Sequence, residues 1–435
     1  MRMMHRITTL LLLALLLCAA QPAIAKEETL ATLQARARKG DAAAQTQLGE
    51  RYLNGNGVKA DDTQAVKLFR QAAKKGNATA QFYLGRAHER GAGVKQDDAE
   101  AVRWYTLAAK QGDKLAQYHL GMMYDFGRGV KQDHVEAARL YRLSAEQGDA
   151  DAQYNLGVAY RIGEGVEENV GEAVKWYTLA AEQGNRMAQN NLGVLHETGE
   201  GVAQNYAEAA KWYLKAAEQG FSNAQYNLAM LYEYGQGVEQ SHTEAARWYK
   251  EAADRGDTSA MTNLGVLYER GQGVEQSHAE AATLYREAAE GGFAIAQFNL
   301  GVFYEFGRGG LGPDAAEAAK WYRLAAEQGD GDAQFNLALL YEQGRGVEGD
   351  LAESVKWFTR SAEQGDKDAQ YNVGVAYRDG NGVERNHAEA AKWIAMAAEQ
   401  GHEGAQGVLG AFYLTGKGVE RDILKGLGLL LRAWF

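Results

Sequence analysis

Cysteine is nearly absent from this chain of 435 residues, and its single copy, Cys18, lies in an apolar N-terminal segment. A thiol nucleophile, a thiolate metal site and a disulfide all need cysteine in the folded chain. None of these is therefore expected after that segment. Proline is almost as scarce, with two copies, and no proline-rich or serine-rich linker divides the sequence into domains.

Basic residues are fewer than acidic ones: the chain has 46 basic and 57 acidic residues, and its net charge is −11. A nucleic-acid partner is not expected, because phosphate binding needs a basic stripe. No second long apolar run follows the N-terminal one, so no integral membrane span is expected. No nucleophile, base and orienting group come together in the sequence, which predicts a non-enzymatic protein without catalytic residues or cofactors.

Residues 1–25 have the pattern of a cleavable signal peptide. Arg2 and Arg6 precede an apolar run over residues 10–20, and small residues precede a cleavage site after Ala25. The sequence therefore predicts a periplasmic or secreted protein. A lipoprotein anchored at Cys18 is the disfavoured alternative, because the residue before this cysteine is bulky.

A 36-residue unit then repeats eleven times up to the C-terminus, with one spacing of 37 residues between Gly292 and Gly329. A fixed period of this length is typical of solenoids, in which each repeat packs only on its neighbours. The opening glycines of the units are Gly40, Gly76, Gly112, Gly148, Gly184, Gly220, Gly256, Gly292, Gly329, Gly365 and Gly401.

Each unit predicts two helices joined by a Gly-x-Gly turn. In the fourth unit, Ala152, Leu156 and Tyr160 lie four residues apart and therefore share one helical face. The turn glycines suit positive φ, and an Asp, Asn or Ser, such as Asp97, caps the second helix. Residues 26–39 are expected to form a lone capping helix, and residues 40–435 the repeat domain, whose last repeat is incomplete.

Three motifs recur through the units: Ala-Gln-x-x-Leu-Gly, as at Ala152; Gly-x-Gly-Val; and Ala-x-x-Trp-Tyr-x-x-Ala-Ala, as at Ala173. With these motifs the chain resembles the Sel-one-like repeat family, a relative of the tetratricopeptide repeats. The resemblance implies an all-α, right-handed solenoid superhelix. It also implies an adaptor that holds other proteins or envelope components together, although one fold hosts many functions.

One face of the predicted first helices carries an aromatic residue and, seven positions later, an acid. Two interpretations stay open: the rows line the concave side and bind an extended, basic or aromatic-rich protein segment, or the aromatics pack between repeats and the acids face water. The aromatic candidates are Phe82, Tyr118, Tyr154, Tyr226, Phe298, Phe335 and Tyr371, and the acidic candidates are Glu197, Glu233, Glu269, Glu305 and Glu342.

The histidines predict no metal site. His242, His278 and His387 recur at repeat spacing, which places them too far apart to bind one ion. They are interpreted as solvated surface residues.

The last predicted helix is apolar around much of its circumference, including Leu427, Leu430 and Trp434. A terminal repeat normally needs a polar outer face. This end is therefore expected to contact a second copy, a partner or a membrane surface, unless the sequence is truncated. A protein interface is favoured because only Lys425 and Arg432 would attract anionic lipid.

These features together predict an exported, non-enzymatic scaffold that binds proteins through the concave face of a solenoid. Two alternatives remain at this stage. One is an envelope-glycan or cell-wall factor that binds carbohydrate or regulates a wall enzyme, and the other is a hydrolase.

Overall fold

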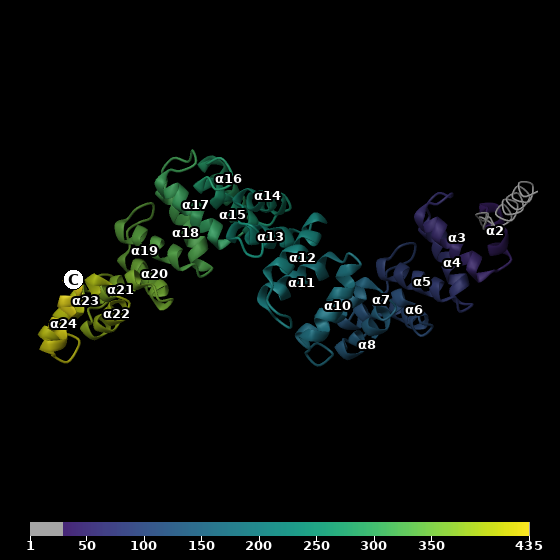
Figure 1. Ribbon diagram of the computed structural model, residues 1–435, viewed down its shortest axis with the longest axis horizontal. Helices are drawn as coiled ribbons and strands as arrows, with labels where there is room; N and C mark the ends of the chain where they lie inside the picture. The colour runs from purple at the N-terminus through teal and green to yellow at the C-terminus, as the bar shows by residue number, and fades with distance from the viewer. Residues whose placement is uncertain (1–28, 435) are drawn as a thin grey trace, which may run out of the picture. The chain divides into compact units, whose positions relative to one another are not determined.

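The computed structural model describes residues 29–434, and all 23 of its regular elements are α-helices (Figure 1). The predicted signal peptide lies outside the described residues. The lone helix expected before the first repeat is α2, which spans Leu30–Arg38. No helix in the described range is both long and apolar enough to cross a membrane.

The helices fall into two compact units, one ending at Ala188 and the other beginning at Gln189. The first unit contains α2, α3 (Ala42–Asn54), α4 (Asp62–Ala73), α5 (Ala78–Arg90), α6 (Asp98–Ala109), α7 (Lys114–Phe126), α8 (His134–Ala145), α9 (Ala150–Ile162) and α10 (Val170–Glu182), while α11 (Arg186–Thr198) contains the boundary. The second unit contains α12 (Tyr206–Glu218), α13 (Ser222–Tyr234), α14 (His242–Ala253), α15 (Thr258–Arg270), α16 (His278–Glu290), α17 (Ala294–Phe306), α18 (Ala315–Glu327), α19 (Gly331–Gln343), α20 (Leu351–Glu363), α21 (Lys367–Asp379), α22 (His387–Glu399), α23 (Glu403–Thr415) and α24 (Ile423–Trp434).

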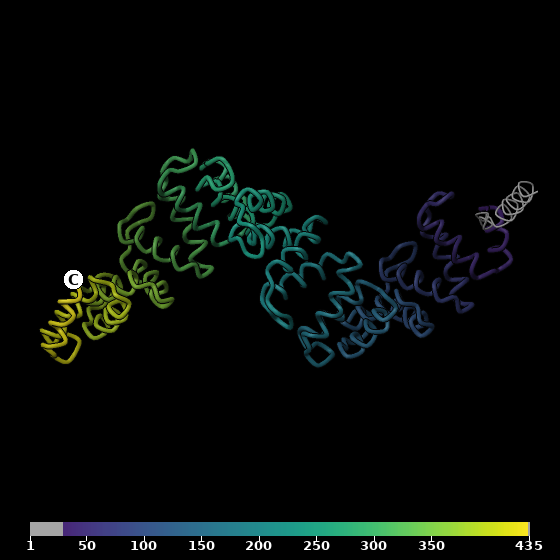
Figure 2. Tube along the Cα trace, viewed as in Figure 1, coloured from purple at the N-terminus to yellow at the C-terminus, as the bar shows by residue number. Residues whose placement is uncertain are grey.

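Within each unit, every helix packs against the helix before it and the helix after it, as a solenoid requires (Figure 2). Odd-numbered helices from α3 on are the first helices of the repeats, and even-numbered helices are the second helices. The predicted caps are confirmed: Asp97, for example, accepts a hydrogen bond from the Glu100 amide at 3.0 Å. First helices end at a left-handed glycine, such as Gly127 after α7, with φ of 65°.

The Leu-Gly pair of the repeat motif is explained by a tyrosine ring. Tyr285 of α16 is fully buried, and its ring lies where a side chain at Gly265 of α15 would be. A Cβ atom at Gly265 would come within 2.6 Å of this ring. Glycine therefore lets the two helices of the repeat approach closely, because the bulky ring fills the space.

The Ala-Gln pair of the motif connects successive repeats. Gln153 of α9 is buried, and its amide donates to the Ala145 carbonyl of α8 at 3.1 Å. Its oxygen accepts from Gln183, which follows α10, at 2.7 Å. One buried side chain thus joins three consecutive helices, and both of its polar ends are satisfied.

The single insertion, at residues 310–313, is absorbed by the connector before α18. The hydroxyl of Tyr322 donates to Glu305 at 2.8 Å, and the equivalent hydroxyl of Tyr285 donates to Glu269 at 3.1 Å. The first two residues are 17 positions apart in the sequence and the second two are 16 positions apart. The helix-to-helix contact is therefore the same with and without the extra residue. Leu311 of the insertion is partly buried against the adjoining core.

Candidate partner-binding face

The predicted aromatic residues pack against the second helix of their own repeat. The ring centroids of Tyr154 and Tyr177 are 5.8 Å apart, and those of Phe335 and Phe358 are 5.3 Å apart. Phe82 is buried. The other candidates, Tyr118, Tyr154, Tyr226, Phe298, Phe335 and Tyr371, are half-buried. Tyr371 stacks on His402 of the next repeat, with ring centroids 4.4 Å apart.

Four of the five predicted acids are held by buried tyrosines. The Tyr249 hydroxyl donates to Glu233 at 2.6 Å, and Tyr213 donates to Glu197 at 2.6 Å. The bonds from Tyr285 to Glu269 and from Tyr322 to Glu305 are equivalent. These acids are half-buried, and their first role is to satisfy a phenol that would otherwise be buried without a partner.

The pKa shifts of these groups favour a protonated tyrosine as the hydrogen-bond donor and an ionised carboxylate as the acceptor. Burial, followed by the hydrogen bond to Glu233, raises the pKa of Tyr249 above the usual range of tyrosine. In the first unit, the His119 imidazole, 3.4 Å from Glu89, is the main cause that lowers the pKa of Glu89 to about 2. The tyrosines therefore stay protonated, and Glu89 stays ionised.

Asparagine forms a third row, which was not identified from the sequence. Asparagine occupies the sixth position of seven consecutive first helices. This recurrence is visible in the sequence and could have indicated the row. Asn263 of α15 donates to the Tyr249 hydroxyl at 3.1 Å. Tyr249 also bonds Glu233 and lies 5.8 Å from the Tyr226 ring, so the three rows meet on one face, which we call the first-helix face. The row consists of Asn155, Asn191, Asn227, Asn263, Asn299, Asn336 and Asn372.

Repeat nine departs from this arrangement. Phe358 replaces the central tyrosine and has no hydroxyl to offer. Across residues 29–434, the side chains of Glu342 in α19 and Asn372 in α21 make no hydrogen bond or ion pair, and Glu342 is exposed. This is the place on the first-helix face where an acid and an amide are available together.

The chain belongs to the Sel1-repeat family. It matches the Sel1 repeat at eleven places, the first at residues 42–77 and the last at residues 405–433. Proteins built from these repeats are typically non-enzymatic scaffolds for protein interaction. The predicted all-α solenoid of 36-residue repeats is confirmed by this match and by the helix pairs of the structure.

Two of the solved structures that are similar to this chain are Sel1-repeat proteins. One is c5321, a protective antigen of uropathogenic Escherichia coli strains with an SLR fold, at 39% identity and a TM-score of 0.82, with 94% of this chain and 87% of that chain covered. The other is a Sel1 repeat protein from Oxalobacter formigenes, at 32% identity and a TM-score of 0.55, with 72% and 90% covered. A search of curated proteins finds no match.

The C-terminal helix α24 has one exposed apolar side. Leu424 is 84% exposed, Leu427 48% and Leu431 61%. Leu430 instead packs against α23, where its Cγ would lie 2.9 Å from a Cβ atom at Gly410. Trp434 ends the helix, but its side chain lies outside the described part of the chain. A test of the terminal interface should therefore change the exposed leucines and leave Leu430 in place.

We expect the parent chain to self-associate in sedimentation, because this removes the exposed apolar side from water, and the triple variant Leu424→Gln, Leu427→Gln, Leu431→Gln to lose that self-association. The matched control is Leu324→Gln on α18, a leucine that is 38% exposed and far along the chain from α24. Parent chain that sediments as a monomer at all concentrations would contradict the interface.

Proposed function

We propose that this protein is an exported, non-enzymatic scaffold that binds an extended segment of a partner protein along the first-helix face, centred on repeats nine and ten. The observation that carries the proposal is Phe358. Because phenylalanine cannot bond to Glu342 or Asn372, both polar groups remain available, whereas the corresponding acid and amide at Tyr249 are used within the protein.

The chemistry of the available groups describes the partner. A side-chain amide presents one donor and one acceptor, which match the carbonyl and N–H of an extended backbone. Glu342 beside it favours a basic side chain and faster association. The half-buried rings of Phe335 and Tyr371 supply apolar contact next to these groups.

Carbohydrate binding is less well supported on this face. A sugar stacks on an open aromatic face, whereas six of the candidate rings pack against an aromatic residue of their own second helix, as Phe335 does on Phe358, and Tyr371 stacks on His402. A hydrolase is not supported, because no described nucleophile lies beside a base and an orienting group on this face. Export rests on the signal-peptide pattern, and a mature N-terminus at Lys26 would test it.

Peptides selected from a random displayed library against the purified chain provide the test. We expect basic, extended sequences whose affinity falls about tenfold in Asn372→Ala, since one hydrogen-bonded contact is worth roughly 1 to 1.5 kcal/mol. Glu342→Gln should mainly slow association.

The matched variant is Phe358→Tyr, which recreates the arrangement at Tyr249 and should weaken peptide binding without loss of stability. Arg247→Ala on the second-helix surface is the neutral control, because its partner Glu244 is an exposed neighbour on the same helix. Selected peptides that bind Phe358→Tyr and Asn372→Ala as tightly as the parent would refute the site.

A further inference from the structure

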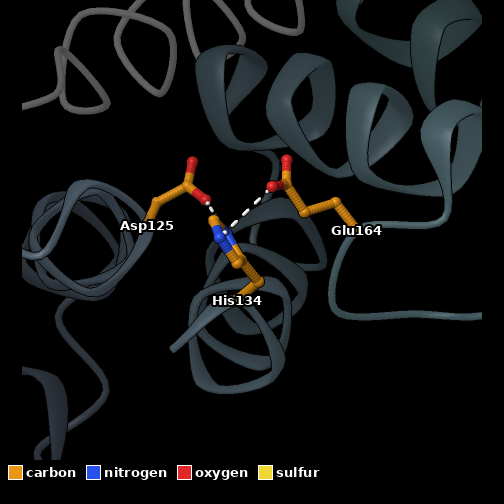
Figure 3. Close-up of side chains that lie close together, drawn as sticks. All are labelled: Asp125, His134 and Glu164. Carbon is orange, nitrogen blue, oxygen red and sulfur yellow. Dashed lines mark hydrogen bonds and ion pairs between the residues drawn. The ribbon is translucent and has the colours of Figure 1, made fainter. Parts of the chain in front are cut away.

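Three side chains of repeats three and four converge on one point (Figure 3). Asp125 of α7 has the same position in its helix as the acids of the later repeats, His134 begins α8, and Glu164 lies in the connector after α9. His134 Nδ1 is 2.8 Å from Asp125 Oδ1, and Nε2 is 3.2 Å from Glu164 Oε1. One ligand atom from each residue lies within 4.8 Å of the others.

At the equivalent positions of the preceding pair of repeats, an arginine side chain lies between two carboxylates. There the residues are Glu89, Asp98 and Arg128, each 36 positions earlier in the sequence. The Arg128 guanidinium lies 3.1 Å from Glu89 and 3.2 Å from Asp98. A permanent positive charge thus neutralises the two carboxylates and joins the two repeats.

Two interfaces in the second unit follow the same rule. Arg308 pairs with Glu269 at 2.9 Å, and Arg345 pairs with Glu305 at 3.2 Å. In each case the arginine comes from the Gly-x-Gly connector of the following repeat. In these three interfaces, the same connector position supplies the arginine that pairs with the acid of the preceding repeat.

Between repeats three and four this arginine is replaced by Glu164. Two carboxylates therefore contact one histidine. Within the described chain, neither Asp125 nor Glu164 forms an ion pair with a lysine or an arginine. The site therefore combines two negative charges with an imidazole at the location that a cation occupies in three other interfaces. The three side chains are also 26%, 31% and 45% exposed, in chain order, so that an ion could enter from solvent.

We propose that Asp125, His134 and Glu164 bind a divalent transition-metal ion of the zinc class, which links repeats three and four in place of the guanidinium. One imidazole nitrogen with two carboxylates suits zinc and its neighbours, whereas calcium and magnesium prefer oxygen alone. Ligand atoms around a tetrahedral zinc ion lie roughly 3.3 Å apart. Because an imidazole binds one ion through one nitrogen, Glu164 would leave Nε2 of His134 and turn toward an ion held between Nδ1 and Asp125, and its 45% exposed side chain is the most exposed of the three.

Tyr141 supports this assignment from outside the ligand set. Its hydroxyl donates to Asp125 Oδ2 at 3.0 Å, which leaves Oδ1 directed at His134. Metal-binding carboxylates are commonly oriented by such a hydrogen bond. The spacing of the histidines in the sequence does not indicate this site, because its ligands come from two repeats and include only one histidine.

Calorimetric titration of the purified full chain with Zn²⁺ tests the proposal. We expect one ion to bind per chain and the unfolding temperature to rise as Zn²⁺ is added in excess. Mg²⁺ and Ca²⁺ at the same concentrations should have at least tenfold weaker effects. His134→Ala should reduce Zn²⁺ affinity at least tenfold.

The most informative variant is Glu164→Arg, which recreates the arrangement of Glu269, His278 and Arg308. It should fold with parental stability and lose Zn²⁺ binding, so that loss of the metal is separated from loss of structure. His278→Ala is the matched histidine control and should bind Zn²⁺ as the parent does. A parent chain indifferent to Zn²⁺, or a Glu164→Arg variant that still binds it, would overturn the assignment.

Discussion

Replacing Gly237 with alanine should destabilise the second unit by about 3 kcal/mol. The residue has φ of 68°, and a Cβ atom there would lie 2.2 Å from the carbonyl carbon of Tyr206 and 2.3 Å from the amide nitrogen of Ala207. Positive φ costs a non-glycine residue about 1 kcal/mol. The backbone clash adds roughly 2 kcal/mol, because two main chains must separate to make room.

The control for this prediction is Gly256→Ala. Gly256 also has positive φ, of 88°, but a Cβ atom there meets nothing within 4 Å. Its alanine variant should therefore lose only about 1 kcal/mol. Urea unfolding of the two variants gives the comparison, and equal midpoints would show that the connector does not rest on the preceding repeat as described.

Reversing the charge of Glu233 should have the second large effect, a loss of roughly 3 kcal/mol. Glu233→Lys removes the acceptor from the hydroxyl of Tyr249, a fully buried side chain, and places an ammonium group in a half-buried position. Thermal unfolding should show a clearly lower midpoint. The destabilisation would arise from lost intramolecular contacts and would be present without any partner.

Glu342→Lys is the matched charge reversal in repeat nine. Repeat nine has Phe358 where other repeats have a tyrosine, and Glu342 is exposed. The free energy of unfolding of this variant should therefore change by less than about 0.5 kcal/mol. If both lysine variants were equally stable, the tyrosine bond would have little energetic value. Otherwise, charge reversal at Glu342 can report on partner binding, whereas reversal at Glu233, Glu269 or Glu305 would first disturb the fold.

The sequence by itself determined the repeat, the helix pairs and their ends. These features depend on local chemistry: a glycine is needed where φ is positive, and a short polar side chain such as Asp97 is needed where a helix begins. Because the same residues return every 36 positions, eleven copies supported each assignment. The aromatic and acidic rows were also visible as rows, since residues at the same position of successive helices align.

Only the tertiary structure decided what those rows contact. Glu233 and Tyr249 are 16 residues apart, Arg308 and Glu269 are 39 apart, and both pairs depend on the direction of side chains after the helices have packed. A spacing in the sequence does not give that direction across different helices. The availability of Glu342 and the convergence of His134 with two carboxylates therefore became visible only when neighbouring repeats were placed side by side, because each depends on which residue the adjacent helix or connector presents.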